Sequence, residues 1–204
     1  MIDRTLLKSL YQPKNEPEIR HIPKLNYITI EGEGNPNGAL FALNVEALYT
    51  ISYAIKMSYK KPNPPLGYYE YKVNPLEGEW DLVDKTKPST DKDNYKYKLM
   101  ILQPDFVNHE VFTRFLQQVI TKKDNPKLLN LKFETIEEGL VCQLLHIGPY
   151  EDEPTSFQRM LDYCQINQYE RVYKGHKEIY LSDPRKADPL KMKTILRFKV
   201  KKIQ

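Results

Sequence analysis

The sequence is short of the features that mark several large classes of protein. It has two cysteines, Cys142 and Cys164, in 204 residues, too few for a disulfide framework or a zinc cluster. No apolar run approaches the roughly 20 residues of a membrane-spanning helix, and mean hydropathy is −0.63. The N-terminal segment lacks the apolar stretch of a secretory signal. We therefore expect a soluble, cytoplasmic protein with no membrane partner and with both thiols buried and inert.

An excess of charge of one sign is also missing. The chain has 31 Lys and Arg against 27 Asp and Glu, a net charge of +4. Nucleic-acid-binding domains usually show a clustered basic face instead of such a balance. Residues 1–20 hold only a short apolar stripe interrupted by prolines, which is too little for a helix-turn-helix domain. No nucleic-acid partner is expected.

What the chain does have is tyrosine, 15 residues in all. Tyrosine combines an apolar ring with a polar hydroxyl, so it suits a wet binding pocket as well as a core. Hydrophobic residues make up 40% of the chain, enough for a sizeable core. The composition alone leaves both interpretations of the tyrosines open.

Periodicity of apolar residues predicts the same order of elements in both halves of the chain. For the first half we expect a strand, a helix, a strand ended by proline, a turn and a strand, at residues 25–34, 39–60, 68–75, 76–81 and 94–104. For the second half we expect two strands around a Glu138-Gly139 hairpin, a helix and two strands, at residues 131–150, 155–167, 177–184 and 194–200. A further helix at about 108–122 links the halves.

This order predicts an α+β fold made of tandem, pseudo-duplicated strand–helix–strand–strand units around a central groove. The expected repeats cover about 21–104 and 131–204, within one domain at 21–204 preceded by an extension at 1–20. Monomer and homodimer are both compatible with an exposed sheet edge.

Alternation along 177–184 indicates which side chains face the groove. Ile179 and Leu181 point together toward the core, so Glu178 and Tyr180 point the other way, and Tyr69 and Tyr71 hold the matching positions in the first copy. A carboxyl group among aromatic rings suits general-base catalysis. The alternative for Glu178 is an ion pair with a lysine on an open sheet surface.

Several separated motifs resemble the GyrI-like family. HKEIYLSDPRKADPLKMKTILRFKV at 176–200 is similar to its C-terminal signature, and LLHIGPYEDEPTSFQRMLDYC at 144–164 is similar to its His-x-Gly-Pro-Tyr turn and following helix. EGEGNPNG, YYEYKVNPLEGEW and KLMILQPDFV resemble the branch that lacks a DNA-binding domain. The resemblance spans about residues 20–203, and the family fold is a tandem pair of such units about a groove.

The resemblance implies a small-molecule site in which the family glutamate corresponds to Glu178. Stand-alone members include hydrolases of reactive cyclopropanoid compounds, while regulator-linked members take up cationic and aromatic drugs. By this resemblance Glu178 would activate water, and Tyr150 or Tyr180 would donate a hydrogen bond to the oxygen that becomes a phenolate. Trp80 would stack on a planar ligand, with Tyr69, Tyr71, Tyr97 and His146 also in the ligand-binding set. No cofactor and no metal are expected.

Each of these residues also has a structural interpretation. Trp80 can cap the core, Tyr150 can hold the Gly-Pro turn, and His146 can be a satisfied strand histidine. Glu77 and Glu79 are expected to be solvated loop charges. His176 is expected to be exposed, and His176-Lys177-Glu178 lacks the helical spacing of a HExxH metal site.

Three classes of function follow. The first is a detoxifying hydrolase of cyclopropanoid or similar electrophilic aromatic compounds. The second is a module that binds or sequesters cationic or lipophilic aromatic molecules without chemistry. The third is a protein-interaction module like the gyrase-inhibiting relatives. The aromatic residues favour the first two.

Overall fold

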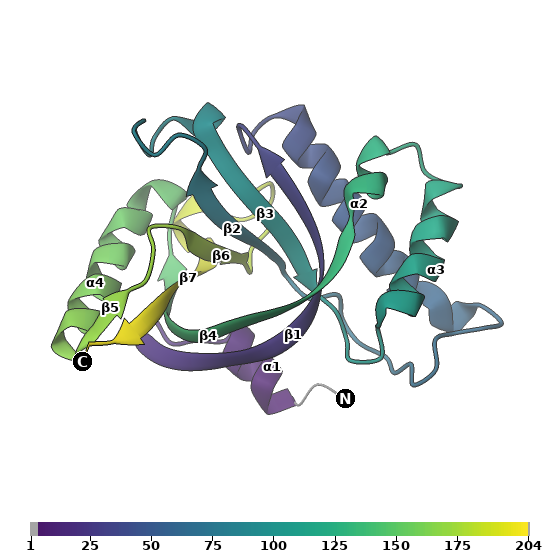
Figure 1. Ribbon diagram of the computed structural model, residues 1–204, viewed down its shortest axis with the longest axis horizontal. Helices are drawn as coiled ribbons and strands as arrows, with labels where there is room; N and C mark the ends of the chain where they lie inside the picture. The colour runs from purple at the N-terminus through teal and green to yellow at the C-terminus, as the bar shows by residue number, and fades with distance from the viewer. Residues whose placement is uncertain (1–3, 204) are drawn as a thin grey trace. The chain divides into compact units, whose positions relative to one another are not determined.

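The computed structural model describes residues 4–203 (Figure 1). The chain forms two compact units, each assembled from separate stretches. Of the described residues, unit 1 is built from 25–75 and 82–136, and unit 2 from 4–24, 76–81 and 137–203. Three strands contribute to both units: β1 (Glu18–Glu33), β2 (Leu76–Leu82) and β4 (Lys132–Ile147). No helix in the described part of the chain is long and apolar enough to cross a membrane.

Unit 1 pairs a sheet with two helices. Its part of β1 runs antiparallel to β3 (Tyr95–Leu102), with Tyr27 opposite Leu102. Helix α2 (Ala39–Lys56) packs on β3 and on α3 (His109–Ile120). The buried side chains of both helices recur every three or four residues, as the sequence predicts for one apolar face. Asn108 fixes the start of α3, since its side-chain oxygen accepts a hydrogen bond from the Val111 N–H at 2.9 Å.

Two predictions for 68–81 are wrong. Residues 68–75 form no strand, and residues 76–81, expected to be a turn, lie in β2. The aromatic residues of 68–71 fit a strand by propensity, but their rings pack around Phe106, with centroids 5.2 Å from Tyr68 and 5.3 Å from Tyr69. The Tyr68 hydroxyl donates to the Lys56 carbonyl oxygen at 2.7 Å. Tertiary contacts, rather than a strand ladder, therefore fix this segment.

Unit 2 is built on β7 (Lys193–Lys202), the strand with the most partners. It pairs antiparallel with β4, with β6 (His176–Tyr180) and with the short β5 (Tyr169–Arg171). Strand β6 pairs in turn with β2, with Gly78 opposite Glu178. Helix α4 (Glu153–Ile166) packs beside β5, and its Met160 and Cys164 are buried in a core with Cys142, Leu144, Leu196 and Phe198. Both cysteines are free and buried, as the sequence predicts.

Strand β4 replaces the hairpin predicted for 131–150, and that prediction is wrong. The strand runs without interruption from Lys132 to Ile147. Gly139 has a φ of +70°, so it bends the strand locally instead of reversing it. Glu138 beside it is 6% exposed, whereas a hairpin turn would have left it in solvent.

Buried charges explain the inward position of Glu138. Lys177 Nζ lies 2.9 Å from Glu138 Oε1 and 3.1 Å from Glu77 Oε2. Arg197 Nη1 lies 3.0 Å from the same Glu138 oxygen. Glu77 is 1% exposed, so the expectation that it is a solvated loop charge is wrong. The sequence pattern missed it because β2 was taken for a turn.

A short helix at the N-terminus of unit 2 adds to this cluster. In helix α1 (Arg4–Tyr11) Leu10 is buried, and its carbonyl oxygen accepts a hydrogen bond from Arg197 Nη2 at 3.2 Å. The Tyr11 hydroxyl donates to Glu77 Oε1 at 2.8 Å. The separate extension expected at 1–20 and the domain limits at 21–204 stay predictions.

The fold class expected from the sequence is confirmed as α+β. A strand, a helix and two further strands occur twice, as β1–α2–β2–β3 and, with the short β5 inserted, as β4–α4–β6–β7, and α3 lies between the two copies in sequence. The two copies in sequence do not coincide with the two compact units, because residues 76–81 of β2 come from the first copy but belong to unit 2. The central groove expected between the copies stays a prediction.

Candidate functional site

A cluster of polar and aromatic side chains lies on one face of β6 in unit 2. Alternation along the strand buries Lys177 and Ile179 on one side and leaves His176, Glu178 and Tyr180 partly exposed on the other. Glu178 and Tyr180 therefore share a face, as the sequence predicts. His176 is on that face too, and its side chain is 24% exposed, so the expectation of an exposed His176 is wrong.

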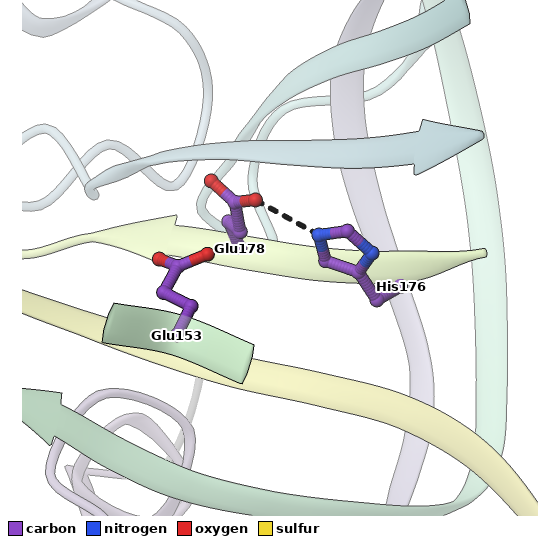
Figure 2. Close-up of side chains that lie close together, drawn as sticks. All are labelled: Glu153, His176 and Glu178. Carbon is purple, nitrogen blue, oxygen red and sulfur yellow. Dashed lines mark hydrogen bonds and ion pairs between the residues drawn. The ribbon is translucent and has the colours of Figure 1, made fainter. Parts of the chain in front are cut away.

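Glu178 is held by a chain of hydrogen bonds. Its Oε1 lies 2.8 Å from His176 Nε2, and its Oε2 accepts the Tyr180 O–H at 2.8 Å (Figure 2 shows the histidine contact). The Trp80 indole N–H donates to the Tyr180 oxygen, also at 2.8 Å. Because indole only donates, the direction from Trp80 through Tyr180 to Glu178 is fixed. Within residues 4–203 the Glu178 carboxyl group contacts His176 and Tyr180 and no lysine. The ion pair with a lysine, which the sequence left open, is therefore not formed there.

Glu153 brings a second carboxyl group to the cluster. It is the first residue of α4, and Figure 2 shows its carboxyl group turned toward that of Glu178. The residue is 7% exposed, and its Oε1 has no hydrogen-bond partner. Desolvation, followed by the charges of Glu178 and Glu151, raises the pKa of Glu153 to about 9. At neutral pH Glu153 is therefore an acid that holds its proton beside Glu178.

Tyr150 approaches the cluster from the turn before α4. Its ring meets the Tyr180 ring edge to face, with centroids 6.3 Å apart and an angle of 90° between the planes. Burial, then the charges of Glu178 and Glu153, raises the pKa of Tyr150 to about 12. Burial raises the pKa of Tyr180 as well. Both phenols keep their protons at neutral pH and can serve as hydrogen-bond donors.

Three of these residues could also hold a metal ion. One ligand atom each from Glu153, His176 and Glu178 lies within 4.8 Å of the other two. A nitrogen and two carboxylate oxygens suit a divalent transition metal, but Glu153 would first have to release its proton. The ligands come from α4 and β6, so a search for a local spacing such as HExxH does not find them. The expectation that the protein needs no metal or cofactor stays a prediction.

The remaining residues expected in the site divide between the two units. In unit 2, Trp80 is 8% exposed, and His146 uses Nδ1 for Ser156 Oγ at 2.9 Å and Nε2 for the Pro149 carbonyl oxygen at 3.1 Å. With both ring nitrogens engaged, the geometry of His146 agrees with its structural interpretation.

Tyr69, Tyr71 and Tyr97 belong to unit 1, and their part in a ligand site stays a prediction. Tyr97 is 3% exposed, and its hydroxyl accepts from Asn44 Nδ2 at 3.1 Å. The Tyr69 hydroxyl donates to Asp105 Oδ1 at 2.9 Å. The Tyr71 hydroxyl is buried without a hydrogen-bond partner, so its donor is still to be satisfied.

Sequence reasoning did not include Glu153 and His176 in the site. A signal was present for His176, since extending the β6 alternation by one step places it with Glu178 and Tyr180. Glu153 follows Glu151 and Asp152 at a helix start, where acidic residues are common because they favour the helix dipole. Nothing in the pattern distinguishes the one that is buried.

Comparisons with known proteins agree with this architecture. The GyrI-like small molecule binding domain family matches residues 15–199. A solved structure of a conserved protein from Listeria innocua is 36% identical, with a TM-score of 0.90 over 95% of this chain and 96% of that one. A solved hydrolase from Listeria innocua is 34% identical, with a TM-score of 0.88 over 97% and 98%.

A more distant structure shows the fold alone. The EcmrR C-terminal domain is 14% identical, with a TM-score of 0.57 over 92% of this chain and 98% of that domain. None of the curated proteins compared with the chain matches it.

Proposed function

The chain belongs to the GyrI-like small-molecule-binding domain family, and we propose that it hydrolyses reactive cyclopropanoid, or similarly electrophilic, aromatic compounds. The observation that carries the proposal is the Glu178 carboxylate, oriented by His176 and Tyr180 beside a Glu153 carboxyl group. The hydrolase from Listeria innocua, similar over almost the whole chain, supports an enzymatic role.

In the proposed reaction Glu178 acts as a general base. It takes a proton from water while the water oxygen attacks a cyclopropane carbon. The strained C–C bond breaks, and its electron pair moves into the conjugated carbonyl group, whose oxygen becomes a phenolate. Both Glu178 oxygens accept one hydrogen bond each, and a carboxylate oxygen has a second lone pair with which to accept the water.

The developing phenolate needs a hydrogen-bond donor. The Tyr180 hydroxyl already donates to Glu178, so we assign the donor role to Tyr150, which holds its proton at neutral pH. Glu153 is the acid that can return a proton to the product oxygen. Trp80 fixes Tyr180 and offers an indole face to an aromatic ligand. A ligand-binding role of Tyr69, Tyr71 and Tyr97, which belong to unit 1, stays a separate proposal.

Turnover of a spirocyclopropane analogue tests the proposal. Wild type should give many turnovers, and Glu178→Gln, which keeps the shape but cannot take a proton, should lose about 10²-fold or more in kcat while still binding the analogue. Glu170→Gln is the matched control, because Glu170 on β5 is a half-exposed carboxyl group whose ion-pair partner is Lys201, at 2.9 Å, outside the candidate site. It should keep wild-type turnover.

The second class of function predicts a different result. A sequestering module would bind the analogue in 1:1 stoichiometry, and neither wild type nor Glu178→Gln would convert it. Equal turnover in the two proteins would remove Glu178 as the base.

A further inference from the structure

The surface of α3 in unit 1 carries a second candidate site, unrelated to Glu178. A cavity of about 250 Å³ lies where the segment after α2 meets α3. It is lined by Lys61, Pro62, Asn63, Arg114, Phe115 and Gln118. All six residues belong to unit 1, whereas Glu178 belongs to unit 2. The proposed hydrolase mechanism uses none of them.

Arg114 is the unusual member of this lining. Its Nε and Nη2 are buried and have no hydrogen-bond partner. Its guanidinium carbon is 4.9 Å from the centroid of the Phe115 ring, so the ring supports the plane of the group without supplying an acceptor. Nε and Nη2 form the edge of the guanidinium that donates two parallel hydrogen bonds to an oxyanion. Buried charged donors without an acceptor are strongly unfavourable, so this edge lacks a partner.

Lys61 provides a second cation at the same cavity. Its Nζ donates to Gln118 Oε1 at 3.2 Å and lies 5.6 Å from the centroid of the Phe115 ring. The acceptor of the Lys61 ammonium group is thus the neutral Gln118 oxygen. An anionic oxygen would form a stronger hydrogen bond with the same group. Both side chains are long and rotatable, so an entering anion can take the place of the Gln118 oxygen and reach Arg114.

Further lysines lie next to this cavity, and no carboxyl group is among the described residues that line it. An adjoining cavity of about 310 Å³ shares Lys61 and Gln118 and is also lined by Lys122 and Lys123. Neither cavity has an Asp or Glu among its lining residues in the described chain. Four cationic side chains therefore line the two adjoining cavities: Lys61, Arg114, Lys122 and Lys123. This concentration of positive charge favours an anion with more than one negative charge.

We propose that the cavity between residues 61–63 and α3 binds the phosphate group of a small organic phosphate, held by Arg114 and Lys61. Two cations match a phosphate dianion better than a single carboxylate. A cavity of about 250 Å³ exceeds the volume of one phosphate ion, and the exposed Pro62 gives it an apolar wall, so the group is carried by a larger molecule. Phenyl phosphate has both features and is the probe for the test.

Calorimetric titration of the full chain with phenyl phosphate tests the site. Wild type should bind one equivalent saturably, and Arg114→Lys, which keeps the charge but removes the two-pronged edge, should weaken binding by about tenfold or more. Lys61→Gln, an exposed change with little effect on folding, should weaken it as well. Lys85→Gln is the control, because Lys85 is exposed and outside both cavities; it should bind as wild type does.

Two further ligands separate the possible anions. Benzoate, with the same ring and one charge, should bind more weakly than phenyl phosphate, and inorganic phosphate should bind more weakly because it leaves the apolar wall unused. Absence of saturable binding to wild type, or equal binding by Arg114→Lys, would overturn the proposal. Equal affinity for benzoate would overturn the assignment to phosphate.

Discussion

Glu153 and Glu178 are two carboxyl groups of one cluster with different partners. Glu178 accepts a hydrogen bond from Tyr180 and lies within hydrogen-bond distance of His176. Oε1 of Glu153 has no donor at all, so burial disfavours its charged form. Burial thus makes Glu153 an acid at neutral pH, a role that its environment alone can create.

The raised pKa of Glu153 predicts how stability depends on pH. The folded protein keeps a proton that the unfolded chain releases above about pH 4.5, so stability falls as pH rises from there to about 9. The slope from this group is at most about 1.4 kcal/mol per pH unit. Glu153→Gln, a neutral mimic of the protonated acid, should remove that slope and be more stable than wild type at pH 8.

Denaturant unfolding at pH 5.5, 7 and 8.5 measures the effect. Glu170→Gln is the control, because Glu170 is exposed on β5 and is not among the charges that raise the pKa of Glu153. The unfolding free energy of this variant should keep the wild-type dependence on pH. Parallel curves for wild type and Glu153→Gln would show that Glu153 is ionised in the folded protein.

At the scale of elements, the sequence was informative where one apolar face decides the structure. Helix α3 and strand β3 follow from their periodicity, and so does the alternation of β6. The errors fall where tertiary contacts override local pattern. Tyr68 and Tyr69 pack on Phe106 instead of entering a strand, and Glu138-Gly139 looks like a turn although an ion pair buries the glutamate.

Part of the candidate site was predictable for the same reason. Glu178 and Tyr180 follow from alternation together with the family resemblance. Glu153 did not, because its burial depends on the packing of α4 against β6, which no local spacing encodes. The sequence also did not indicate which residues belong to which unit, since residues 76–81 of the first copy are part of unit 2.

The bend in β4 gives a prediction at this scale. Gly139 has a positive φ, and a Cβ added there would meet nothing within 4 Å. Gly139→Ala should therefore destabilise the protein through backbone strain alone, by about 1 kcal/mol. Gly139→Asn should lose less, because asparagine tolerates this conformation better.

Thermal or denaturant unfolding of the three proteins provides the measurement. A loss of several kcal/mol in Gly139→Ala would contradict the open surroundings of this position. No loss would contradict the positive φ.

For the whole molecule, the buried charges of unit 2 set the response to acid. Burial alone would raise the pKa of Glu138, but Lys177 and Arg197 lower it to about 2. The resulting stabilisation is present above the unfolded value of about 4.5 and is lost as pH falls toward 2. Glu138→Gln should cost about 3–5 kcal/mol at pH 7, because it leaves two buried cations short of a partner.

The loss should shrink as pH approaches 2, where wild type also lacks the carboxylate. Glu137→Gln is a control one residue away, at a side chain 49% exposed and 3.7 Å from Lys24, and it should change stability by about 0.5 kcal/mol or less. The unfolding of wild type, Glu138→Gln and Glu137→Gln during acid titration is measured by circular dichroism. A constant gap between Glu138→Gln and wild type down to pH 2 would contradict the lowered pKa.

Strand β6 has a consequence for how this protein can change over generations. Lys177 and Ile179 hold the interior, while His176, Glu178 and Tyr180 form the candidate site. Along these five consecutive positions, the buried residues that stabilise the fold alternate with the residues of the candidate site. New ligand preferences can be sampled at the even-numbered positions while the odd-numbered ones preserve the scaffold, so a combinatorial library restricted to 176, 178 and 180 should yield a high fraction of folded variants.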